Sequence, residues 1–148
     1  MDQTFPVESN CKICNGQADR DFKRIEVWQN RLWRLTASTH KQVKGFCYLE
    51  PKRHIRNITE LNGEEAREFG TVVAAVSNAI KIAFDAKLVY LYVFGDHIPH
   101  LHVHLAPHHD GDIFQDDVVK NSVNLNEETV DSQEVKGMVS SINSAIKF

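Results

Sequence analysis

The first third of the chain alternates between hydrophobic and polar residues in a way that predicts β-structure. Residues 24–29 alternate loosely, residues 30–31 read as a turn, and residues 32–35 complete a hairpin. Residues 45–49 form a short apolar and aromatic run, which is typical of a buried strand and should end at Pro51. These segments predict three strands before the first long helix.

A long amphipathic helix is the element that the pattern predicts most clearly. Between Ala66 and Ala83, apolar residues recur every three or four positions, so they share one helical face. Asn62 followed by Glu65 has the form of an N-cap with a reciprocal acid three residues later. We therefore expect a helix at about 62–85 that begins with this capping box.

The remaining pattern completes the expected fold class. Residues 88–94 are almost wholly apolar and predict a central strand covered on both faces. A second amphipathic helix is expected at 131–147, with Asp131 and Glu134 as capping residues. Strands, helix, strands and helix in this order predict an α+β domain with an antiparallel sheet.

Composition narrows the class of protein further. The 148 residues fit one domain, 1–148, and 42% hydrophobic with 25% charged residues is ordinary for a globular protein. A net charge of −3 argues against a protein that binds nucleic acids or membrane surfaces in a general way. Because the chain has no long apolar run and no signal-peptide pattern at its start, we expect a cytoplasmic protein.

Histidines are concentrated in one short segment. Six of the eight fall within residues 97–109, whose centre alternates His-Leu-His-Val-His-Leu from His100 onward. A strand from about His100 would place His100, His102 and His104 on one face, roughly 6.5–7 Å apart. Each imidazole needs a hydrogen-bond partner or water, so the pattern favours phosphate chemistry or metal binding over a structural face.

The three cysteines point to a second kind of chemistry. Cys11 and Cys14 have the Cys-x-x-Cys spacing in a polar N-terminal segment, whereas Cys47 lies in an apolar strand. An odd number with this spacing is unlike a secreted disulfide framework, and it indicates half of a zinc site or a redox pair. Zinc is favoured if two further ligands exist, and Cys47 is expected to be a core residue.

The motif from His100 to Pro107 closely resembles the signature of the histidine-triad (HIT) family, His-φ-His-φ-His-φ-φ, where φ is apolar. Residues 45–54 resemble the family's other landmark, a strand that ends in Pro-Lys-Arg-His, and the likeness covers roughly residues 11–107. It implies a five-stranded antiparallel sheet with two main helices. It also implies a two-fold homodimer that pairs through a helix and a sheet edge.

The resemblance also implies a covalent mechanism and roles for particular residues. His102 would attack phosphorus and carry the nucleotidyl group, and His104 would contact the phosphate oxygens and protonate the leaving group. Asp96, His97 and His108 are the other candidate substrate contacts. They are also departures: His108 follows Pro107 where relatives often carry an arginine, and Asp96 and His97 stand near where many have a small amide or hydroxyl residue.

A structural zinc ion is implied by the same resemblance. Galactose-1-phosphate uridylyltransferase and a zinc-containing branch of the hydrolases carry an N-terminal Cys-x-x-Cys. Carried over to this chain, the ligands would be Cys11, Cys14, His54 and His100, a closed tetrahedral set that tethers segment 1–20 to the sheet. The alternative is that His100 relays a hydrogen bond to the nucleophile and pairs with His54.

The function expected from these residues is hydrolysis of a nucleotide. The bond broken would lie at the α-phosphorus of a nucleoside phosphoramidate or dinucleoside polyphosphate, and an adenine base is expected from the family alone. Two alternatives stay open. One is a nucleotidyltransferase that uses an acceptor other than water, and the other is a nucleotide-binding or interaction module with little turnover.

Outside these motifs, the sequence predicts little chemistry. His40 lies in a polar stretch and is expected to be solvated. Residues 108–128 are polar and acidic, which predicts a loop with solvated carboxylates, among them Asp110, Asp112, Asp116 and Asp117.

Overall fold

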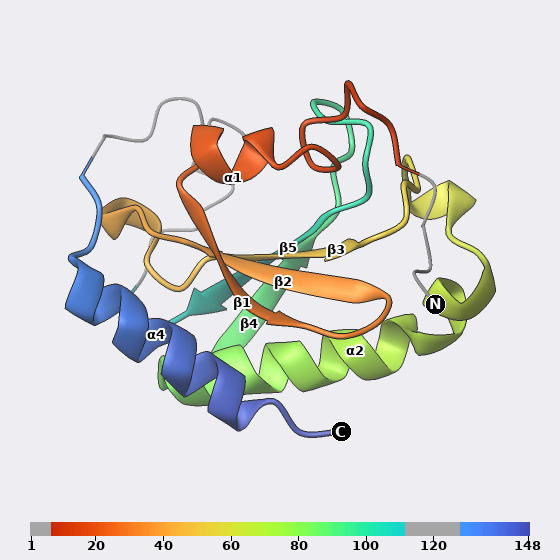
Figure 1. Cartoon of the computed structure of the whole chain (residues 1–148). Helices are drawn as coiled ribbons and strands as arrows, with labels where there is room; N and C mark the ends of the chain where they lie inside the picture. The colour runs from red at the N-terminus through yellow and green to blue at the C-terminus, as the bar shows by residue number, and fades with distance from the viewer. Residues whose placement is uncertain (1–6, 112–127) are drawn as a thin grey trace.

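The computed structural model describes residues 7–111 and 128–148. It contains a five-stranded sheet in the order β1-β2-β3-β5-β4, and each neighbouring pair is antiparallel (Figure 1). The strands are β1 Arg24–Gln29, β2 Trp33–Ser38, β3 Cys47–Pro51, β4 Leu88–Tyr92 and β5 Val103–His108. The helices are α1 Gln17–Asp21, α2 Gly63–Ala83 and α4 Ser132–Ala145, with 3-10 turns η1 Lys41–Val43 and η2 Ile58–Glu60. The α+β class, the five antiparallel strands and the two main helices are confirmed.

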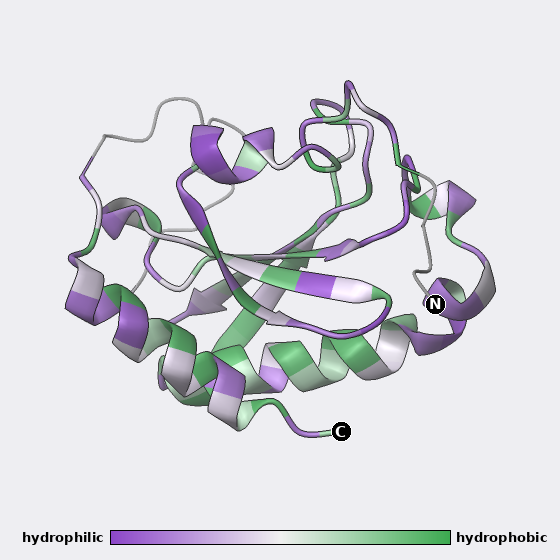
Figure 2. Ribbon diagram, viewed as in Figure 1, coloured by the Kyte–Doolittle hydropathy of each residue, from purple (hydrophilic) through white to green (hydrophobic). Residues whose placement is uncertain are grey.

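The hydrophobic core lies between the sheet and the two long helices. Figure 1 shows α2 and α4 on one side of the sheet, and Figure 2 shows broad hydrophobic stretches along α2. Val76 and Ile80 of α2 and Ile142 of α4 are fully buried against Leu49 and Val103 of the sheet. Burying each such side chain stabilises the fold by about 1.5–3 kcal/mol.

The other side of the sheet faces the N-terminal segment and α1 (Figure 1), and we call it the α1 face. Strand alternation puts Leu49 into the core, and it turns Tyr48 and Glu50 to the α1 face. Likewise Val103 lies in the core and His104 on the α1 face, directly opposite Tyr48 in the ladder. The candidate chemistry therefore lies on the α1 face, away from the main core.

The first hairpin forms as predicted. Asn30 provides the turn, because its side-chain oxygen accepts hydrogen bonds from the backbone N–H groups of Leu32 and Trp33, at 2.9 and 2.7 Å. The pairing of β1 with β2 contains one irregularity, between Glu26 and Trp28. The hairpin brings residues of β1 and β2 side by side beneath α1.

Both helices begin near the predicted residues, but only one has the predicted cap. Asp131 accepts a hydrogen bond from the backbone N–H of Glu134 at 2.8 Å, which caps α4. Asn62 is the N-cap of α2, yet its side chain makes no capping bond and instead accepts from Arg53 at 2.7 Å. Glu65 also binds Arg53, so the predicted capping box was wrong.

Two expectations about the strands were also wrong. Residues 88–94 do not form a central strand: β4 lies at the sheet edge, and Leu91 is 44% exposed. The order differs because β5 inserts between β3 and β4. The histidine strand begins at Val103 instead of His100, since the N–H of Leu101 bonds to the carbonyl of Ile55 outside the sheet ladder.

The polar segments differ in part from expectation. His40 is buried, not solvated, because residues 128–130 cross beside it and Thr129 forms a bridge with it. His108 belongs to β5, so the predicted loop begins after it. The expectations for Asp112, Asp116 and Asp117 lie outside the described residues.

Within the described residues, no helix is both long enough and apolar enough to cross a membrane.

Candidate functional site: a metal centre beside a histidine pair

Four candidate ligands meet at one point although they are distant in sequence. The ligand atoms of Cys11, Cys14, His54 and His100 all lie within 4.8 Å of one another. The Cys14 sulfur lies 3.3 Å from Nδ1 of His54 and 3.4 Å from Nδ1 of His100, and the Cys11 sulfur lies 3.5 Å from the same His100 atom. The sequence-predicted set is therefore brought together completely.

These distances fit a tetrahedral zinc ion. With zinc–sulfur bonds of about 2.3 Å and zinc–nitrogen bonds of about 2.0–2.1 Å, a tetrahedron separates sulfur from nitrogen by about 3.6 Å. Two thiolates and two imidazoles are a donor set typical of closed structural sites. The four residues thus fit structural zinc, and a closed set leaves no coordination position for a substrate.

The surroundings of His100 and Cys14 decide the protonation of these two ligands. Nε2–H of His100 donates a hydrogen bond to the carbonyl of Pro51 at 2.8 Å. The lone pair of the ring therefore lies on Nδ1, the nitrogen that faces the cysteines and can bind the metal. Burial, more than any other cause, lowers the pKa of His100 to about 4, so its ring is neutral. Burial raises the pKa of the Cys14 thiol to about 11, so forming its thiolate at neutral pH needs a bound cation.

His102 has a tautomer that is defined by a backbone hydrogen bond. Its Nδ1–H donates to the backbone carbonyl of His100 at 2.6 Å. The lone pair of the ring is therefore on Nε2, which carries no proton in the neutral form. Burial is the largest cause that lowers the pKa of His102, and the positive charge of Arg24 also lowers it. A neutral imidazole with an available Nε2 is the form that can act as a nucleophile.

His104 lies beside His102 in an aromatic environment. The two rings are 5.0 Å apart between centroids, and the ring of Tyr48 lies 5.2 Å from His104. Phe46 and Phe94 complete the surroundings at 5.8 and 5.6 Å. Burial is the main reason that the pKa of His104 falls to about 3. Its buried Nδ1 has no hydrogen-bond partner among the described residues.

The other three candidate contacts are placed differently. Asp96 and His97 are exposed in the connection between β4 and β5, and their charges act on the pKa of His102. His108 lies four residues beyond His104 along β5, about 13 Å away at the rise of a strand. Its ring packs on Tyr90, with the centroids 4.9 Å apart. The structure therefore does not bring His108 to the pair His102–His104.

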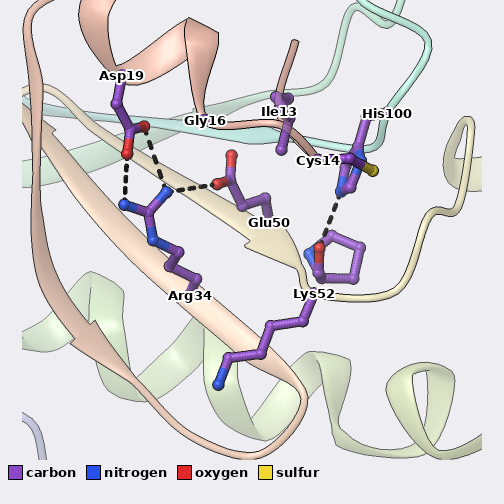
Figure 3. Close-up of a pocket in the computed structure, with 9 residues that line it drawn as sticks. Ile13, Cys14, Gly16, Asp19, Arg34, Glu50, Lys52 and His100 are labelled. Carbon is purple, nitrogen blue, oxygen red and sulfur yellow. Dashed lines mark hydrogen bonds and ion pairs between the residues drawn. The ribbon is translucent and has the colours of Figure 1, made fainter. Parts of the chain in front are cut away.

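A charged pocket beside the metal centre was missed by sequence reasoning. Figure 3 shows Asp19, Arg34 and Glu50 in this pocket, which has a volume of about 270 Å³ and shares Cys14 and His100 with the metal centre. Glu50 follows Leu49, the last residue of β3 that pairs with β5, and its side chain is buried on the α1 face. The available signal was Glu50 itself, a carboxylate at the end of an otherwise apolar strand.

Comparisons with known proteins agree with this geometry. The HIT domain profile matches residues 24–111. A histidine triad protein from Sinorhizobium meliloti 1021 has a similar structure, with a TM-score of 0.76, 19% identity, and 96% of this chain and 97% of that chain covered. One from Bradyrhizobium japonicum has a TM-score of 0.75 and 19% identity, with 97% and 98% covered. No curated protein matches the sequence.

A zinc-bound relative is among the similar structures. It is a histidine triad family protein from Mycobacterium smegmatis, with a TM-score of 0.64, 16% identity and 93% of each chain covered. At sequence identities below 20%, these structural similarities show that the fold is shared and no more. The domain profile matches more than half of the chain. The chain therefore belongs to the HIT domain family.

Proposed function

We propose that this protein is a nucleotide hydrolase that acts at the α-phosphorus through a covalent nucleotidyl-histidine intermediate. The observation that carries the proposal is the 2.6 Å hydrogen bond from Nδ1 of His102 to the carbonyl of His100. This bond orients the ring and leaves Nε2 as the nucleophilic atom. A covalent intermediate divides one difficult displacement at phosphorus into two easier ones.

In the first step, Nε2 of His102 bonds to the α-phosphorus, and the bond to the leaving group breaks. His104 lies 5.0 Å from His102, between ring centroids, and is the group that contacts the phosphate oxygens. Their negative charge favours protonation of its ring, which is neutral in the free protein, so that His104 takes up a proton from solvent and hands it to the leaving group. Water then attacks the same phosphorus and gives a proton to His104, which is neutral again after the first step. The phosphorus–nitrogen bond breaks, its electron pair returns to His102, and the nucleoside monophosphate is released.

The metal centre supports this chemistry without entering it. Zinc held by Cys11, Cys14, His54 and His100 would supply structural cross-linking between the N-terminal segment and the triad segment. His100 takes part in both sites, because its ring is a metal ligand while its carbonyl accepts the proton of His102. Fixing His100 therefore also fixes the orientation of the nucleophile.

Nucleoside phosphoramidates and dinucleoside polyphosphates are the proposed substrates, with adenine as the expected base. Asp96 and His97 are the proposed contacts near the leaving group, since both lie close enough to affect the pKa of His102. His108 stays a proposed substrate contact from the sequence alone. A transferase that passes the nucleotide to another acceptor would use the same residues.

A nucleotide-binding module with little turnover is the second candidate. It is favoured by His108, which follows Pro107 where relatives often carry an arginine and which packs on Tyr90, away from His102 and His104. Without that cation, phosphate oxygens would be held less tightly in the transition state. Nucleotide binding without release of product would identify this function.

A mass measurement tests the enzyme directly. Wild type and His102→Ala are mixed with adenosine phosphoramidate, quenched rapidly and weighed as intact proteins. A transient gain of one AMP on the wild type supports the proposal if it is absent from His102→Ala and present on His109→Ala, a matched histidine variant whose ring bonds to the carbonyl of Phe84. If the wild type binds the nucleotide but neither forms the adduct nor releases AMP, the binding module is the better explanation.

Homodimerisation and a cytoplasmic location stay predictions. The dimer is supported by the exposed apolar side chains at the β4 edge, where Leu88, Leu91, Val93 and Phe94 are 38–44% exposed.

A further inference from the structure

A network of four charged residues connects α1 to the first three strands of the sheet. Arg24 lies on β1, Arg34 on β2 and Glu50 on β3, and both arginines bind Asp19 of α1 and Glu50. The nitrogen–oxygen distances from Arg24 and Arg34 to Asp19 are 2.8 and 2.5 Å, and those to Glu50 are 3.1 Å each. We call these four residues the clasp, and Figure 3 shows its Asp19–Arg34–Glu50 part.

The clasp is built into the interior. The side chains of Arg24 and Glu50 are 3% and 2% exposed, and that of Asp19 is 24% exposed. Charges at such depth lose their hydration and are tolerated only when they are paired. Burial pulls the pKa of Asp19 upward, but hydrogen bonds from Arg34 and Arg24 outweigh it, so the pKa lies below its ordinary value. Asp19 is therefore a carboxylate at neutral pH.

One end of the clasp holds the segment that carries the two cysteine ligands. Helix α1 has only five residues, a length at which helices are not stable on their own. A short turn separates α1 from Cys14. Asp19 is the residue of α1 that binds the two arginines of the sheet. The Asp19 contact therefore limits where Cys11 and Cys14 can lie.

The other end of the clasp holds a histidine ligand. Glu50 is bonded in sequence to Pro51, and the Pro51 carbonyl accepts the 2.8 Å hydrogen bond from Nε2 of His100. Fixing Glu50 between two arginines thus fixes the strand end that orients His100. His54 follows three residues after Pro51. The clasp is consequently linked through the backbone to the cysteine ligands and, through Pro51, to the histidine ligands, and it supplies no ligand itself.

We propose that Asp19 is a positioning residue for the metal site: through Arg24 and Arg34, it docks the cysteine-bearing segment onto the sheet and pre-forms the site for the metal ion. A metal ion that binds a pre-formed site does not have to order the segment itself, so its affinity is higher. The role is independent of the enzymatic function proposed above.

Asp19→Asn tests this role, because it keeps the size of the side chain and removes its charge. Glu26→Gln is the matched control. Glu26 accepts a 2.8 Å bond from the same Arg34, but it is 42% exposed and connects only β1 with β2. Zinc affinity is measured on each full chain by competition with a chelator. We expect Asp19→Asn to bind zinc about 10–100-fold more weakly and Glu26→Gln to match the wild type.

Cobalt spectra and a conservative variant separate positioning from a general loss of stability. With Co²⁺ bound, Asp19→Asn should reach the wild-type tetrahedral spectrum only at higher metal concentration, and Asp19→Glu should recover part of the affinity. Unchanged zinc affinity in Asp19→Asn, or equal weakening by Glu26→Gln, would overturn the proposal. Should Asp19→Asn fail to fold, Arg34→Lys, which keeps the charge but loses the two-pronged contact, is compared with Glu26→Gln by the same criteria.

Discussion

Arg53 binds Glu65 with two parallel hydrogen bonds, each 3.1 Å long, and so fastens the Pro-Lys-Arg-His segment to the first turn of α2. The Glu65 side chain is only 5% exposed, whereas that of Arg53 is 25% exposed. Because Arg53 precedes His54 directly, this ion pair also restrains a metal ligand. It explains why Glu65 is unavailable for the predicted capping box.

Removing the Arg53 guanidinium should destabilise the fold measurably. In Arg53→Met the Glu65 carboxylate stays buried without its partner, which we expect to cost about 1.5–3 kcal/mol in the free energy of unfolding. Urea denaturation measures the change. Arg56→Met is the control, since the pair Arg56–Glu60 is exposed to solvent and should contribute little. Equal effects of both variants would contradict this interpretation.

Loss of one cysteine ligand should act mainly on stability. Cys14→Ala removes the sulfur that lies within 3.4 Å of both histidine ligands. We expect loss of stoichiometric zinc and a lower melting temperature, because the metal no longer links the N-terminal segment to the sheet. Elemental analysis and thermal melts check both. A chelator should lower the melting temperature of the wild type but not of Cys14→Ala, and an unchanged melting temperature in the variant would remove the zinc hypothesis.

Replacing His104 should slow turnover more than it weakens binding. With the ring gone, no imidazole stands beside His102 to pass a proton to the leaving group. We expect His104→Ala to lower kcat by about 10²–10⁴-fold. Rapid-quench kinetics with adenosine phosphoramidate measures it, and nucleotide affinity is followed in parallel. A loss confined to affinity would show that His104 serves binding alone.

Acid should remove the contribution of Asp19 to stability. The pKa of Asp19 in the folded protein is lower than its ordinary value of 3.8, so the folded state favours the charged carboxylate. The stabilisation is complete above the ordinary value and is lost as the pH falls through the lower, folded value. In zinc-free protein, the difference in melting temperature between wild type and Asp19→Asn should stay constant down to about pH 5 and shrink below 3.8. A difference that does not depend on pH would contradict this.

The sheet edge offers a test of the expected homodimer. Leu91 is 44% exposed on β4, the edge strand. A charge at this position should be costly if the edge is covered by a second copy. We expect Leu91→Glu to elute as a monomer where the wild type elutes as a dimer. A wild type that is itself monomeric at the same concentration would remove the homodimer from the proposal.

Local patterns predicted most of the elements, because helices and hairpins depend on residues close in sequence. The turn at Asn30 and the cap at Asp131 were both readable from side chains within three residues of their partners. The resemblance to the HIT family added the ligand set, including the two histidines. Those four residues do meet in the structure.

The sequence by itself predicted phosphate chemistry and metal binding, since histidines and cysteines at these spacings suit few other purposes. Of these two, the metal site is the part that the structure confirms. Tertiary structure decided what depends on distant partners. It placed β4 at the edge by inserting β5 beside β3, and it gave Glu65 to Arg53 instead of a helix cap. It also joined Asp19 to Glu50 through two arginines. Such pairings depend on which strands and helices become neighbours. The hydrophobic periodicity of one segment predicts its secondary structure and its buried face, but not its neighbours.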